Sequence, residues 1–151
     1  MKKTILSAIA AFALLSFTTS CDSDDREKTI TPTDLPAPVD VFVTQHFPNA
    51  TYARVTKEHK TERDGSLYDV LLTNGFEIEF DAAGNWVDIE GHYQPVPVEL
   101  IPEKINAFVT ENYKDSHVTS IDNEPGHTEI ELSNRLELIF DPNGNFVGID
   151  R

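Results

Sequence analysis

The chain has a single cysteine, Cys21, and a single tryptophan, Trp86, among its 151 residues. Without a second cysteine no disulfide can form within the chain, so stability must come from an apolar core. Basic residues are also scarce, because 12 Lys and Arg stand against 26 Asp and Glu, for a formal net charge of −14. A surface this acidic repels nucleic acid and anionic lipid headgroups, which excludes nucleic-acid binding as an expected function.

Long apolar runs are absent except at the N-terminus, where Ile5 to Phe17 follows two lysines. This run is too short to span a membrane and predicts a signal peptide over residues 1–20. Cys21 follows Thr18, Thr19 and Ser20, a layout that resembles a lipobox with Thr18 where leucine is usual. We therefore expect a lipid on Cys21, which would hold the protein at a membrane. An ordinary cleaved signal with a coincidental cysteine is the alternative.

Residues 21–34 are acidic and threonine-rich and lack apolar periodicity, which predicts a lipidated flexible tether. The acidic cluster within residues 22–25 resembles the export signal of surface lipoproteins of the Bacteroidetes. It favours display on the cell surface, with a solvated spacer as the alternative. The expected location is the cell envelope, as an outer-membrane lipoprotein.

The rest of the chain repeats itself. Leu35-Pro36 matches Ile101-Pro102, and FEIEFDAAGNWVDIE from Phe76 matches LELIFDPNGNFVGID from Leu136. The first copy carries the longer loop, KEHKTERDGS, where the second has only NEPG. A duplication with one shortened hairpin explains both observations.

Each copy begins with a helical pattern and continues with strands. Val39, Phe42, Val43, His46 and Phe47 share one helical face, as do Ile105, Phe108, Val109, Asn112 and Tyr113. Residues 76–80 and 136–140 then alternate with the period of a strand, and Asn74-Gly75 predicts a tight hairpin. Weaker strands are expected near residues 52–58 and 118–123.

The expected fold is therefore α+β, a tandem duplication of an α-β-β-β-β unit. Antiparallel sheets would carry one helix per repeat packed on one face. We place repeat 1 at residues 35–91, a linker with two prolines at 92–100, and repeat 2 at 101–151. A unit of this size is marginal alone, so both copies are expected to share a core.

These residues resemble the PepSY-like lipoproteins of the Bacteroidetes, whose fold is akin to that of the tandem-repeat beta-lactamase inhibitor protein. The resemblance covers about residues 35–151 and rests on these pieces: Leu35-Pro36, Phe47-Pro48, Asn74-Gly75, and Phe80-Asp81 followed by Gly84 and Trp86. The second copy departs from the pattern at Lys114, Arg135 and Phe146. The resemblance implies the fold and a module that binds or restrains other proteins, such as proteases. It assigns no functional residues, because the matching positions are hairpin and core residues.

No catalytic, metal or cofactor site is expected. The five histidines lie on different predicted elements without the spacing of a zinc site. DPNGN offers oxygen ligands but lacks the bidentate glutamate of a calcium loop, so we interpret it as a turn. Glu77 and Glu79 alternate along a strand, which indicates a solvated sheet face rather than paired catalytic carboxylates.

Strand alternation places Trp86 and Phe146 opposite the core side defined by Val87 and Ile89. With Tyr52, Glu77 and Glu79 they form the predicted binding face, an open sheet face with exposed aromatics among acids. A sheet that curls over these aromatics is the alternative. The expected function is a non-enzymatic module that binds a protein, including an enzyme it would inhibit. The alternative is a small-molecule or glycan-binding accessory lipoprotein, favoured by a cleft lined by Trp86, Tyr93 and Phe146.

Overall fold

The computed structural model describes residues 27–150, so the predicted signal peptide, Cys21 and the acidic cluster lie outside the described residues. Within this range, nine strands form one antiparallel sheet in sequence order. Helix α1 (Ala37–His46) precedes strands β2 (Tyr52–Glu58), β3 (Ser66–Leu72), β4 (Glu77–Asp81) and β5 (Trp86–Glu90). Helix α2 (Glu103–Asn112) precedes β6 (Val118–Asp122), β7 (Thr128–Leu132), β8 (Glu137–Phe140) and β9 (Phe146–Asp150). The expected order of one helix and four strands therefore occurs twice.

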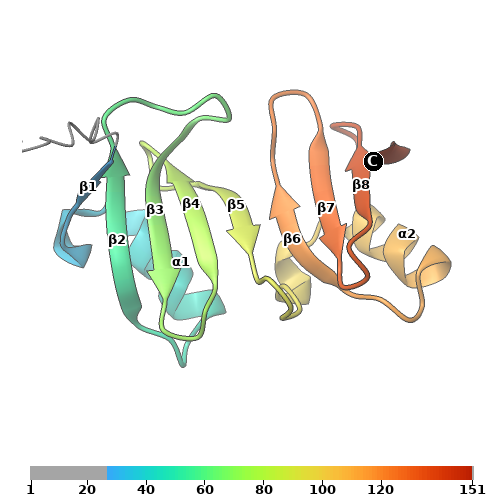
Figure 1. The fold of residues 1–151 in the computed structure, drawn as a ribbon, viewed down its shortest axis with the longest axis horizontal. Helices are drawn as coiled ribbons and strands as arrows, with labels where there is room; N and C mark the ends of the chain where they lie inside the picture. Colours follow the sequence, from blue (N-terminus) through green and yellow to red (C-terminus); the bar gives the residue numbers. More distant parts are fainter. Residues whose placement is uncertain (1–26, 151) are drawn as a thin grey trace, which may run out of the picture.

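The sheet is continuous rather than divided between the two halves. Strand β5 pairs with β6 through Asp88↔Asp122, Ile89↔Ile121 and Glu90↔Ser120. Both helices lie behind the sheet in the view of Figure 1, so the opposite sheet face carries no helix of residues 27–150. Among the described helices, none is long and apolar enough to cross a membrane.

The predicted tether is wrong for residues 27–34. Strand β1 (Glu27–Thr29) pairs with β2 at the sheet edge, and a short 3-10 helix, η1, spans Pro32–Asp34. No apolar pattern marks this strand in the sequence, because all three residues of β1 are exposed and pair with β2 through the backbone.

The linker between the halves packs against the sheet. Val96 is buried, and its amide donates to the carbonyl of Val118 in β6. A second 3-10 helix, η2 (Val98–Leu100), leads into α2.

The core lies between the helices and the sheet. Val39 and Val43 of α1 and Ile105 and Val109 of α2 are buried. The sheet contributes residues of both halves to one cluster: Val70, Leu72, Ile78, Phe80, Ile89, Ile121, Ile130, Leu132, Leu138 and Phe140. The rings of Phe42 and Phe108 meet those of Phe80 and Phe140 edge-on, with centroids 5.6 and 5.4 Å apart. The shared core expected from the sequence is therefore present.

The turn before β5 is held by the side chain of Asp81 and packs closely against the start of α1. One carboxylate oxygen of Asp81 accepts hydrogen bonds from the amides of Ala83 and Asn85, at 2.8 and 2.9 Å. Gly84 has φ +87°, and a Cβ there would lie 3.0 Å from Cβ of Pro36 at the start of α1. Asp81 therefore shapes a turn that packs against the start of α1.

Candidate functional site

The predicted binding face does not form as expected, because Trp86 lies on the helix side of the sheet. Trp86 pairs with the buried Phe80, at a point where the register between β4 and β5 shifts by a bulge. Directly paired residues project from the same face, and Trp86 packs partly buried against the core cluster. The bulge adds one residue to β5, so simple alternation from Val87 and Ile89 assigned the wrong face.

Phe146 and Tyr52 also lie on the helix side of the sheet rather than on the predicted open face. Phe146 pairs with Phe140 across an equivalent bulge, and its ring stacks on Phe108 of α2 with centroids 4.7 Å apart. The hydroxyl of Tyr52 donates to Asp40 of α1 at 3.2 Å. All three aromatic residues therefore belong to the helix side, and the idea of aromatics among acids on the open face is wrong.

Glu77 and Glu79 keep the alternation predicted for them. Their neighbours Ile78 and Phe80 are completely buried toward the helices, whereas both glutamates are only partly covered. Glu79 lies beside a shallow hollow of about 380 Å³ that is lined almost entirely by acids. The open face is thus acidic without being aromatic.

Pairing across the sheet aligns these acids in two rows. The first row crosses five adjacent strands, one carboxylate from each, through the pairs Asp69↔Glu79, Glu79↔Asp88, Asp88↔Asp122 and Asp122↔Glu129. The second row runs through Glu77, Glu90, Ser120, Glu131 and Glu137. Directly opposed like charges on one face destabilise a sheet. We call these two rows the acidic face.

The carboxylates at the centre of the acidic face are the most strongly perturbed. Burial, followed by the charges of Asp122, Glu79 and Glu90, raises the pKa of Asp88 to about 8. Burial and neighbouring acids, Glu124 first, raise the pKa of Asp122 to about 6. Burial also raises the pKa of Glu79. Each of these groups would be stabilised as an anion by a cation placed beside it.

Few cationic side chains of the described residues lie beside these carboxylates. Within residues 27–150, Arg54 forms an ion pair with Asp69 at one end of the first row, at 3.4 Å. At the other end His127 Nε2 lies 2.7 Å from Glu129. In the same range, no ion pair reaches Asp88 or Asp122, and Oδ1 of Asp122 is buried without a hydrogen-bond partner. Within residues 27–150, the central carboxyl groups of the acidic face therefore have no cationic partner, which is consistent with their raised pKa values.

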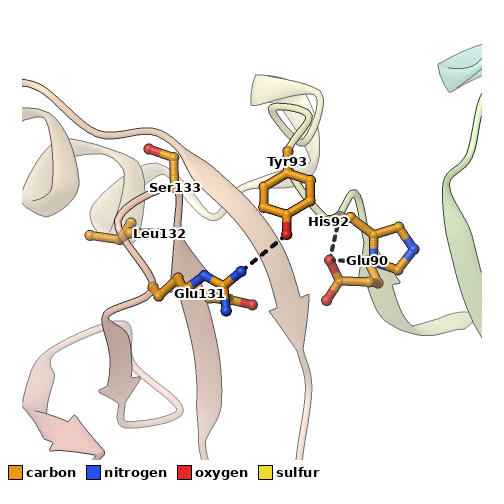
Figure 2. A pocket seen from close by; sticks show the side chains of 7 residues that line it. Glu90, His92, Tyr93, Glu131, Leu132 and Ser133 are labelled. Atoms are coloured by element: carbon orange, nitrogen blue, oxygen red, sulfur yellow. Dashed lines mark hydrogen bonds and ion pairs between the residues drawn. The ribbon is translucent and has the colours of Figure 1, made fainter.

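A second hollow, of about 450 Å³, lies where the loop after β5 meets the β7–β8 hairpin. Figure 2 shows the side chain of Tyr93 in this hollow. The hydroxyl of Tyr93 accepts a hydrogen bond from the guanidinium of Arg135 at 3.0 Å. Arg135 replaces the hairpin glycine of the first half and adopts φ +66°. Tyr93 lines this hollow but Trp86 and Phe146 do not, so the hollow is not the cleft of these three aromatics that would favour glycan binding.

Within the described residues, no group of three or more His, Cys, Asp or Glu side chains is arranged to hold a metal ion. Three of the histidines instead lie beside single glutamates, such as His46 with Glu99 at 3.3 Å.

Sequence reasoning missed Asp88 and Asp122 as site residues. Each alternates with buried apolar neighbours on its strand, so the pattern could have assigned both to the open face. Their direct opposition required knowledge of the β5–β6 pairing, for which the sequence carries no local signal.

Comparisons with known proteins agree with this fold. The chain is similar to a "putative calcium-regulated periplasmic protein" from Bacteroides thetaiotaomicron, with 38% identity, 84% of this chain and 98% of that chain covered, and a TM-score of 0.77. A periplasmic protein from Bacteroides vulgatus is 33% identical over 85% of this chain and 99% of its own, with a TM-score of 0.75. Another from the same species is 26% identical over 83% and 99%, with a TM-score of 0.76.

No curated protein matches the chain significantly. The periplasmic descriptions of the similar structures support a location in the cell envelope. The model of one protein family, described as "Putative beta-lactamase-inhibitor-like, PepSY-like", matches residues 21–63 and 66–148. This match spans both halves of the sheet, and the chain belongs to the PepSY-like family.

Proposed function

We propose that this protein is a binding module of the cell envelope whose acidic face docks a basic segment of another protein. The observation that carries the proposal is the row of carboxylates across β3 to β7. It ends beside Arg54 and His127, and no cation of the described part of the chain forms an ion pair at its centre. Lysine or arginine side chains of a partner would supply that charge.

The position of the row suits a protein partner. It runs across the strands of a continuous sheet on the face without helices, so an extended segment could lie along it. The hollow beside it is shallow and acid-lined rather than apolar, which favours charged side chains over an apolar small molecule.

We further propose that the chain is held at the outer membrane by a lipid on Cys21 and arose by tandem duplication. An inhibitory role would follow if the basic segment lies beside an enzyme's active site.

Calcium is the second candidate ligand, because one similar protein is described as calcium-regulated. Calcium takes six to eight oxygen ligands at short distance, and Asp122 offers an unpartnered oxygen. However, no three acids of the described part are arranged to hold a metal, so calcium would require side chains to move. A lysine or arginine approaches on its own flexible side chain, which is why we favour the basic partner.

The test compares two matched variants of the chain from Asp22 to Arg151. Glu79→Gln with Asp122→Asn removes two acids from the acidic face, and Glu103→Gln with Glu111→Gln removes two from α2. Titration calorimetry with an oligolysine peptide should show affinity reduced about tenfold or more by the first pair. The second pair should change affinity less than about twofold, because exposed charges away from the site are screened.

Proton release gives an independent readout. Because a bound cation lowers the raised pKa of Asp88 and Asp122, binding near pH 7 should release protons, measurable in buffers of different ionisation enthalpy. Equal effects of both variant pairs would refute the acidic face as the docking surface. Binding of calcium with higher affinity than oligolysine would replace the basic partner with the metal.

A further inference from the structure

The last strand, β9, presents an apolar sheet edge. Val147 and Ile149 are 64% and 43% exposed, although the matching residues of the first half, Val87 and Ile89, are 8% and 0% exposed. The difference follows from the sheet order: β6 pairs with the far edge of β5, whereas β9 is the end of the described sheet. Exposed apolar edge strands are sites of further strand pairing.

The two edges of the sheet differ. At the opposite end, β1 pairs with the edge of β2. It has only three residues, Glu27 to Thr29, and two of them, Glu27 and Lys28, are charged. Short, charged strands are how proteins prevent pairing at an edge. Strand β9 is longer and has Phe146, Val147, Gly148 and Ile149 in sequence before its first charge.

We propose that β9 is a self-association surface, which pairs antiparallel with β9 of a second copy to give a closed two-fold dimer. The internal junction provides the precedent, since β5 buries Val87 and Ile89 when β6 pairs with it antiparallel. A head-to-tail chain of copies would require pairing of β9 with the outer edge of β1, which is a short and charged strand. Pairing between two copies of β9 uses the same surface twice and therefore closes.

The strand is self-complementary in this arrangement. With Gly148 on the two-fold axis, Val147 of one copy lies opposite Ile149 of the other. Ile149 pairs with the buried Leu138, so it projects toward the helix side, and the two apolar pairs of the dimer would extend the core. Because the contact is small and both copies are acidic, the dimer should be weak, with a Kd of roughly 10–100 µM.

Sedimentation equilibrium of the chain from Asp22 to Arg151 tests this proposal, with loading concentrations up to about ten times that Kd. The wild-type chain should dimerise, and Val147→Lys should leave it monomeric. Val41→Lys is the matched control, because Val41 is equally exposed, at 63%, but lies on α1. Its dimerisation should equal that of the wild type.

Salt distinguishes this surface from the acidic face. Raising the ionic strength screens repulsion between two acidic copies and should strengthen the dimer, whereas it should weaken binding of a basic segment. Amides of β9 should also exchange hydrogen more slowly as protein concentration rises. A monomer at every concentration would overturn the proposal. So would equal effects of both lysine variants, or an open series of larger oligomers.

Discussion

Replacing Asp88 with asparagine removes the most perturbed carboxyl group of the acidic face while preserving its size. The pKa of Asp88 is about 8, against an ordinary value of 3.8, with burial as the largest cause. The folded chain therefore binds this proton more tightly than the unfolded chain does. A raised carboxyl pKa lowers the free energy of unfolding as pH rises, from about pH 4 up to about pH 8, because the unfolded chain loses its proton first.

The size of the effect follows from that window. Each pH unit inside it costs about 1.4 kcal/mol for one group, so the wild type should lose up to about 4 kcal/mol between pH 5 and pH 8 through Asp88. Asp88→Asn lacks this loss. The variant should therefore gain stability relative to the wild type as pH rises, by at least about 2 kcal/mol across the interval even if neighbouring acids relax.

Urea unfolding followed by far-UV circular dichroism at pH 5 and pH 8 measures this difference, using the chain from Asp22 to Arg151. Glu103→Gln, which removes a charge from the exposed start of α2, should differ from the wild type by less than about 0.5 kcal/mol at both pH values. If the difference between Asp88→Asn and the wild type is the same at pH 5 and pH 8, the assignment of a raised pKa to Asp88 is wrong.

Three further predictions concern the core, the tryptophan and the anchor. Truncating Phe80 or Phe140 to alanine should lower the free energy of unfolding by about 3–5 kcal/mol, because both side chains are fully buried. Calorimetry of the wild type should show one unfolding transition, because the halves share a core, and two transitions would contradict this. The fluorescence of Trp86, which packs against the core on the helix side, should peak at shorter wavelength than that of free tryptophan and be quenched weakly by iodide. Red-shifted, readily quenched emission would contradict this position. Replacing Cys21 with serine should abolish metabolic palmitate labelling, and equal labelling of both forms would exclude Cys21 as the lipid site.

The acidic face could be predicted in part. The alternation of Glu77 and Glu79 with Ile78 and Phe80 was enough to assign those glutamates to the solvated side, because strand geometry repeats every two residues. The row that they join could not be predicted, since it depends on which strands are neighbours and in which register. Asp88 and Asp122 become opposed only through pairing of β5 with β6.

Trp86 and Phe146 show where local rules fail. A single extra residue in β5 and β9 reverses the alternation for the residues on either side of it. Nothing in WVDIE or FVGID distinguishes a regular strand from a bulged one. The bulge is identified by its partner strand, where Phe80 and Phe140 each oppose an aromatic residue.

The sequence by itself determined the local structure: two helices with one apolar face each, the hairpin turns at Asn74-Gly75 and Asp81, and the strands that carry the core. These features depend on side-chain periodicity and turn chemistry within a few residues. The tertiary structure alone decided that both halves share one sheet, that β1 closes one edge, and that Val147 is exposed where Val87 is buried. The physical reason is that backbone pairing between strands carries no side-chain signature, so neighbours across the sheet are settled only when the chain packs.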